Sequence, residues 1–166
     1  MKHHIGGMQK YLPIVMPLIA PYPNSYRRFS PYLSSPVNIH WGHDNRSVGL
    51  RIPRSEPKAR RIENRIPGAD VNPYLVIAAS LACGYLGMKE KLQPDNAMDS
   101  SAYESPENSL PKNFREALEG FSKNEAIKEV LGEEFVTLFS DIKKYEYDEF
   151  DQIITPWERE HLLMKV

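Results

Sequence analysis

The sequence predicts an α+β fold in which a small antiparallel sheet is backed by helices. Three observations indicate this class. Apolar and polar residues alternate in three short segments between Val37 and Ile66, and apolar residues recur at helical spacing beyond Asn72. The chain also contains 14 prolines among its 166 residues, which favours short elements joined by fixed turns. Its 41% hydrophobic and 26% charged residues exclude disordered and fibrous proteins.

Residues 1–66 are expected to form one helix, a loop and arginine-rich strands. The helix covers Ile5 to Met16 and must end before Pro17, and the proline-rich stretch 17–36 predicts an extended, rigid loop. The apolar residues of the three strand-like segments are Val37, Ile39 and Trp41, then Val48, Leu50 and Ile52, then Ile62 and Ile66. The last two segments are separated by a loop of hairpin length.

Residues 67–166 are expected to be mainly helical. Asn72 followed by Pro73 is typical of a helix start, because proline at the first helical position needs no N–H. Ser122 with Glu125 predicts a capping box for a further helix. The stripes at helical spacing are Leu75, Ala79, Ala82 and Leu86, then Phe135, Leu138, Ile142 and Tyr145, and Thr155 to Glu158 caps a final helix.

Positive charge is concentrated in residues 27–65, which hold eight arginines and one lysine against three acidic residues. On an ideal strand, Arg61, Glu63 and Arg65 project from one face, and Arg51 lies on the polar face of the neighbouring segment. Guanidinium groups bind phosphate and carboxylate through two parallel hydrogen bonds. A carboxylate between two guanidinium groups is therefore a candidate anion or metal site.

Two other interpretations of this segment remain open from composition. The alternating charges could form a solvated ladder of salt bridges that contributes little to stability. Alternatively, the arginines and the nearby aromatic residues could bind a single-stranded nucleic acid. The formal net charge of −1 gives no global attraction to nucleic acid or to an anionic membrane, and no glycine-rich phosphate-binding loop is present.

Several residue types indicate which other classes of protein are excluded. The single cysteine, Cys83, allows no internal disulfide and no thiolate zinc cluster, and we expect it to be buried and inert. The five histidines show no metal-ligand spacing. The longest uncharged run covers 73–88 and is too short to span a bilayer. We expect a cytoplasmic protein that does not interact with membranes or nucleic acid.

Three runs of sequence resemble a known family. These are NSYRRF (24–29), PVNIHWGHDNRSVGLRIP (36–53) and ARRIENRIPGADVNPYLVIAASLACGYLG (59–87). They are similar to the C-terminal half of the glutamine synthetase catalytic domain. Within that superfamily they are most similar to the γ-glutamylputrescine synthetase (glutamate–putrescine ligase) branch, and the similarity extends to the closing PWEREHLLMKV.

The resemblance implies a ligase that uses ATP as co-substrate with Mg²⁺ or Mn²⁺. The side-chain carboxylate of glutamate takes the terminal phosphoryl group of ATP, and an amine then displaces phosphate from γ-glutamyl phosphate. By position, the resemblance assigns glutamate to Arg28, Arg46 and Arg65, ATP to Arg46, Arg51 and Lys58, and one divalent metal ion to Glu63. Arg46 would be the catalytic residue, since it would contact both glutamate and the transferred phosphate.

Two departures from the family pattern refine these expectations. Ser34 stands where ammonia-using members carry a glutamate, which favours putrescine or another organic amine as the nucleophile. The family's N-terminal β-grasp domain and most metal-binding residues are expected to be absent from residues 1–166. We therefore expect the chain alone to be inactive, and full-length members to form homo-oligomeric rings. The alternatives are an ammonia-using glutamine synthetase and a non-catalytic remnant that acts in assembly or nucleotide binding.

Overall fold

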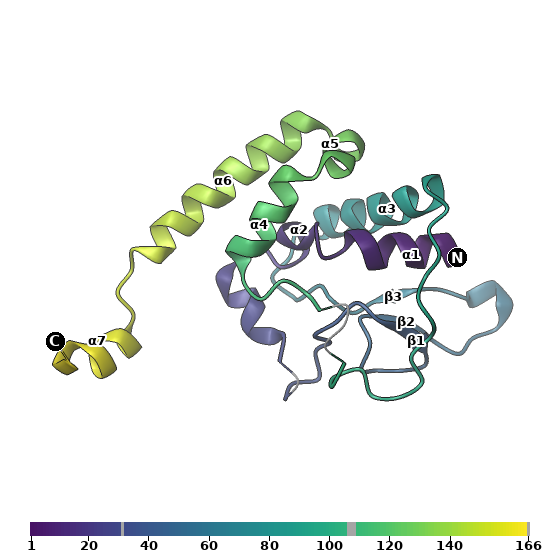
Figure 1. The fold of residues 1–166 in the computed structure, drawn as a ribbon, viewed down its shortest axis with the longest axis horizontal. Helices are drawn as coiled ribbons and strands as arrows, with labels where there is room; N and C mark the ends of the chain where they lie inside the picture. The colour runs from purple at the N-terminus through teal and green to yellow at the C-terminus, as the bar shows by residue number, and fades with distance from the viewer. Residues whose placement is uncertain (31, 106–108, 166) are drawn as a thin grey trace.

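The computed structural model describes residues 1–30, 32–105 and 109–165. These residues form a three-stranded sheet and a set of helices, so the predicted α+β class is confirmed (Figure 1). The strands are β1 (Trp41–His43), β2 (Leu50–Ile52) and β3 (Glu63–Asn64). The α-helices are α1 (Lys2–Tyr11), α2 (Met16–Ile19), α3 (Pro73–Lys89), α4 (Phe114–Lys123), α5 (Glu125–Leu131), α6 (Glu133–Asp151) and α7 (Pro156–Leu162). The 3₁₀ turns are η1 (Pro23–Arg28), η2 (Pro57–Ala59) and η3 (Leu163–Lys165).

The sheet is mixed, whereas the sequence predicts an antiparallel one. Strand β2 is central; it pairs antiparallel with β3 but parallel with β1. The side chain of Asn38 explains the parallel pair, because it binds the carbonyl of Ser47 at 3.1 Å and the amide of Gly49 at 3.4 Å. These bonds hold residues 47–49, which precede β2, beside Asn38, which precedes β1. The two strands therefore start at the same end of the sheet and run in the same direction. Alternating polarity carries no information about strand direction.

Two of the expected helix boundaries are wrong. The first expected helix divides into α1 and α2, and Pro17 lies in the first turn of α2 rather than beyond the helix end. A proline is tolerated there because first-turn amides have no partner within the helix. The capping box expected at Ser122 is absent, because α4 continues to Lys123 and Asn124 caps α5 by accepting from the amide of Ile127 at 3.0 Å. The predicted caps at Asn72 and Thr155 are confirmed, and the structure shows that the cap at Thr155 is a capping box.

The core lies between the sheet and the pair formed by α1 and α3. Helix α1 approaches α3 closely through glycines, since a Cβ atom on Gly7 would lie 2.2 Å from the carbonyl oxygen of Cys83. Cys83 is fully buried, and burial raises the pKa of its thiol. The sheet contributes Leu50 and Ile52, which flank Arg51 in sequence and turn towards the helices. This packing leaves Arg51 on the opposite side of β2.

The C-terminal helices form a second layer. Phe114 and Phe121 of α4 are buried with Val136 of α6, whereas α7 lies apart from the body beyond the end of α6 (Figure 1). Large apolar side chains are also exposed along the outer faces of three helices: Tyr74, Ile77, Leu81, Tyr85 and Met88 on α3, Leu138, Ile142 and Tyr145 on α6, and Trp157 and Leu162 on α7. In the described part of the chain, no helix has both the length and the apolar character needed to cross a bilayer.

Candidate active site

Arg51 is the centre of a group of charged side chains at the middle of the sheet. It is directly opposite Glu63 in the register of β2 and β3, and its Nη1 lies 2.9 Å from Oε2 of Glu63. Its Nη2 donates a hydrogen bond to Oδ1 of Asp44, the residue that follows β1. Only 17% of the Arg51 side chain is exposed. The guanidinium group is therefore held between two carboxylates that come from opposite sides of its strand.

Arg65 approaches Glu63 from the other side. Its Nε lies 3.4 Å from Oε1 of Glu63, so each oxygen of this carboxylate faces a different arginine. The Arg65 guanidinium also donates to three backbone carbonyls, those of Arg46, of Val48 at 3.2 Å and of Ser34 at 3.3 Å. We call Asp44, Arg51, Glu63 and Arg65 the charge cluster.

Arg28 and Arg46 lie beside the charge cluster. Arg28, at the end of η1, donates from Nη1 to Oγ of Ser35 at 2.6 Å and from Nη2 to the carbonyl of Ile66, the residue after Arg65. Burial lowers the pKa of the Arg28 guanidinium, and the Asp70 carboxylate opposes that effect. Arg46 precedes β2, and its side chain is exposed. Arg28 is thus tied to the segment that carries Arg65, and the backbone of Arg46 is tied to Arg65 itself.

Lys58 and Arg61 lie apart from this group. Lys58 belongs to η2, in the connection from β2 to β3, and is exposed. Arg61 is also exposed and donates to the carbonyl of Ala59 at 3.4 Å. The expected face of Arg61, Glu63 and Arg65 is therefore formed only in part. The reason is that β3 contains just two residues, so Arg61 lies before the strand and does not follow its alternation.

Asp44 is a member of the charge cluster that sequence reasoning missed. The hydrogen bond from Arg51 lowers the pKa of its carboxyl group, and the same bond, followed by the one to Glu63, raises the pKa of Arg51. Asp44 has a φ of 51°, in the left-handed region that aspartate and asparagine enter more readily than most residues. An aspartate directly after a strand-like segment was the available signal for such a turn.

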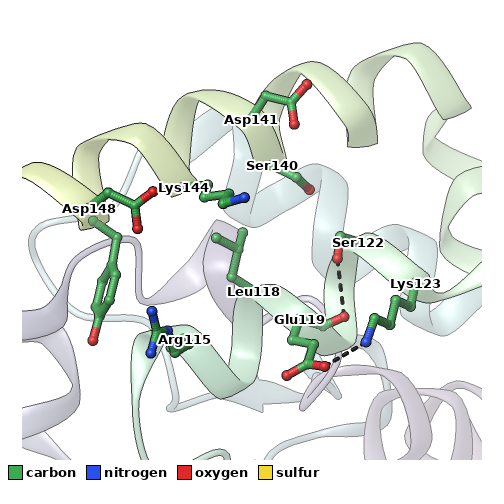
Figure 2. Close-up of a pocket in the computed structure, with 10 residues that line it drawn as sticks. Arg115, Leu118, Glu119, Ser122, Lys123, Ser140, Asp141, Lys144 and Asp148 are labelled. Atoms are coloured by element: carbon green, nitrogen blue, oxygen red, sulfur yellow. Dashed lines mark hydrogen bonds and ion pairs between the residues drawn. The ribbon is translucent and has the colours of Figure 1, made fainter.

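A separate hollow of about 320 Å³ lies between α4 and α6 (Figure 2). Leu118 of α4 points towards Lys144 of α6, whereas the Glu119 carboxylate turns towards Lys123 and pairs with it at 2.5 Å. Its lining includes acids and bases in similar numbers and contains none of the candidate site residues. The charge cluster and the hollow are therefore distinct features of the molecule.

Known proteins are similar to this chain over nearly its whole length. Residues 1–162 match the family model for the glutamine synthetase catalytic domain. The chain is 36% identical to the γ-glutamylethanolamide synthetase GlnA4 of Streptomyces coelicolor, over 95% of this chain and 34% of that protein. It is 37% identical to the γ-glutamylputrescine synthetase PuuA of Escherichia coli, over 98% of this chain and 34% of that protein.

A relative named glutamine synthetase and a solved structure are similar to the chain as well. The chain is 35% identical to a glutamine synthetase of Thermococcus kodakarensis, over 92% of this chain and 36% of that protein. The solved structure of apo GmaS without ligand superposes with a TM-score of 0.85 at 31% identity, and the match covers 98% of this chain and 38% of that one. The chain thus spans about a third of the length of the curated relatives it matches.

Proposed function

This chain belongs to the glutamine synthetase catalytic-domain family, and from that premise we propose that it supplies part of the active site of an ATP-dependent glutamate–amine ligase. In this reaction the side-chain carboxylate of glutamate attacks the terminal phosphorus of ATP and ADP leaves. The amine then attacks the carbonyl carbon of γ-glutamyl phosphate, and phosphate leaves as the amide bond forms.

The observation that supports this proposal is the placement of Arg51 and Arg65 on either side of Glu63. Catalysis of phosphoryl transfer depends mainly on positioning and on neutralising negative charge that spreads over the phosphate oxygens. We assign Arg51, Lys58 and Arg46 to ATP, and Arg28, Arg46 and Arg65 to glutamate. Arg46 has an exposed side chain next to the carbonyl that Arg65 binds, which suits the catalytic role of contacting both substrates.

Glu63 is the residue that we assign to a divalent cation, Mg²⁺ or Mn²⁺. Carboxylate oxygens are the ligands that these hard cations prefer, and 37% of the Glu63 side chain is exposed. Among the described residues, no group of three His, Cys, Asp or Glu side chains is placed to hold a metal ion. Glu63 would therefore provide one ligand within a larger set. A bound ion would neutralise charge on the phosphates.

We further propose that the nucleophile is an organic amine. Ser34 is exposed, and its carbonyl accepts a hydrogen bond from Arg65 at 3.3 Å, so this position lies beside the charge cluster without adding a carboxylate. A neutral residue there offers no charge to attract ammonium. Two of the relatives are named for putrescine and ethanolamine, and both amines are candidates here. We also propose a cytoplasmic location and a homo-oligomeric ring for the complete enzyme.

Turnover by the chain alone tests whether it holds only part of the site. We expect ADP release with Mn²⁺, ATP, glutamate and either putrescine, ethanolamine or ammonium to equal that of the Glu63→Gln variant, because one carboxylate does not hold the metal ions of phosphoryl transfer. The measurement is a coupled assay of ADP. Release that depends on glutamate and exceeds the Glu63→Gln rate would show that the chain is a complete enzyme.

The second candidate function is a non-catalytic module that binds nucleotide or takes part in assembly. It is favoured by the charge cluster itself, because two arginines around one carboxylate could bind the phosphates of a nucleotide without glutamate. A module that binds nucleotide requires the charge cluster to bind ATP, as the ligase does. The two differ in whether glutamate binds beside it, which the Arg65 variants discussed below measure.

A further inference from the structure

We propose that Asp44 is a positioning residue, which holds the guanidinium group of Arg51 in the orientation that receives a phosphate group of ATP. The inference rests on the proposed function for the identity of the ligand. The geometric part, that Asp44 fixes Arg51, stands on the contacts of the charge cluster alone.

Arg51 is held on both sides by carboxylates. It projects from the central strand, and its two Nη atoms face carboxylates on opposite sides: Glu63 on β3 at 2.9 Å and Asp44 at the end of β1. A guanidinium group bound at both terminal nitrogens has no free rotation about its last bonds. The Nε of Arg51 is buried and has no hydrogen-bond partner among the described residues, so the two Nη contacts are what fix the group.

The backbone of Asp44 adopts an uncommon conformation. Among the described residues, Asp44 and Lys91 are the two non-glycine residues with positive φ. The amide of Asp44 donates to the carbonyl of Ile52 at 2.9 Å, which ties this turn to the end of β2. Residues held in sparsely populated backbone conformations persist where the surrounding structure determines them, and they gather at binding sites. The turn thereby directs the Asp44 carboxylate back over Arg51.

The contact between Asp44 and Arg51 differs from an ordinary surface ion pair. Asp44 also faces Arg54, but that pair is 4.0 Å apart and the Arg54 side chain is 90% exposed. Exposed ion pairs of that kind contribute little to stability. The partner that matters is Arg51, of whose side chain only 17% is exposed. A guanidinium that is already ordered loses less rotational freedom when a phosphate binds, so the restraint outweighs the repulsion between phosphate and the nearby carboxylate.

The experiment compares Asp44→Asn and Asp44→Gly with the unaltered chain. Asparagine and glycine both enter the left-handed region readily, so both variants keep the turn. The control is Glu119→Gln, which removes the carboxylate of an exposed ion pair on α4. We expect the Arg51 guanidinium group to rotate more freely in both Asp44 variants, which ¹⁵N-resolved NMR detects as averaging of its Nη signals. We also expect Mn²⁺–ATP to bind roughly two- to tenfold more weakly in isothermal titration, with Glu119→Gln unchanged.

The outcomes separate the two claims. Arg51 signals that do not change in the Asp44 variants, or ATP that binds equally well or more tightly, would overturn the inference. If the unaltered chain binds no ATP while Arg51 still becomes mobile without Asp44, the proposed function fails and the structural part of the inference stands.

Discussion

Gly7→Ala is expected to lower the free energy of unfolding by about 1–3 kcal/mol, the range for overpacking a well-packed core. The added Cβ would lie 2.2 Å from the carbonyl oxygen of Cys83 and 2.6 Å from Cα of Gly87. Both are backbone atoms of α3 that no side-chain rotation can move. The two helices must separate, and the buried contacts beneath them weaken. Urea denaturation followed by circular dichroism measures the change.

Gly120→Ala is the matched control for this prediction. Gly120 lies in α4, and a Cβ at this position would meet no atom within 4 Å. Alanine has the higher helix propensity, so this variant should gain roughly 0.5–1 kcal/mol. If Gly7→Ala were as stable as the unaltered chain, the claim that α1 and α3 approach closely at Gly7 would be wrong.

Arg65→Ala is expected to weaken glutamate binding by at least about thirtyfold, the equivalent of about 2 kcal/mol for one lost partner of a hydrogen-bonded charge pair. Arg65 joins Glu63 to the carbonyls of Arg46, Val48 and Ser34, so its loss also frees two loops beside the site. Titration of glutamate in the presence of Mn²⁺–ATP measures the affinity. Arg65→Lys should recover only part of it, because an ammonium group lacks the planar fork of donors.

Arg61→Ala is the control for Arg65. Arg61 carries the same charge in the same segment, but it is exposed and binds the carbonyl of Ala59. The Arg61→Ala variant should therefore bind glutamate with the same affinity as the unaltered chain. Equal losses in Arg61→Ala and Arg65→Ala would indicate a general effect of positive charge. Glutamate affinity that is unchanged in Arg65→Ala would favour the module that binds nucleotide without catalysis.

Much of the site follows from alternation in the sequence. Alternation placed Arg51 and Glu63 on the polar faces of neighbouring segments, and the structure pairs them directly. Buried Leu50 and Ile52 explain this success, since a residue between two inward-facing side chains must point outward.

Other features depend on contacts that a linear pattern does not contain. The parallel pairing of β1 and β2 depends on the bonds of the Asn38 side chain, and the position of Asp44 depends on a turn with positive φ. Arg61 follows the same alternation as Glu63 but lies outside a strand of two residues. The exposed apolar stripe could not be assigned to α3 from the sequence, because helical spacing shows which residues share a face but not what covers it.

The central claim is that the charge cluster binds the phosphates of ATP, and isothermal titration of Mn²⁺–ATP tests it most directly. The unaltered chain should bind saturably, Arg51→Ala should lose that binding, and Arg159→Ala, which removes an exposed arginine from α7, should retain it. Equal affinity in Arg51→Ala would contradict the claim. So would a chain that binds no ATP but binds a single-stranded oligonucleotide with steep salt dependence, as expected of a nucleic-acid module.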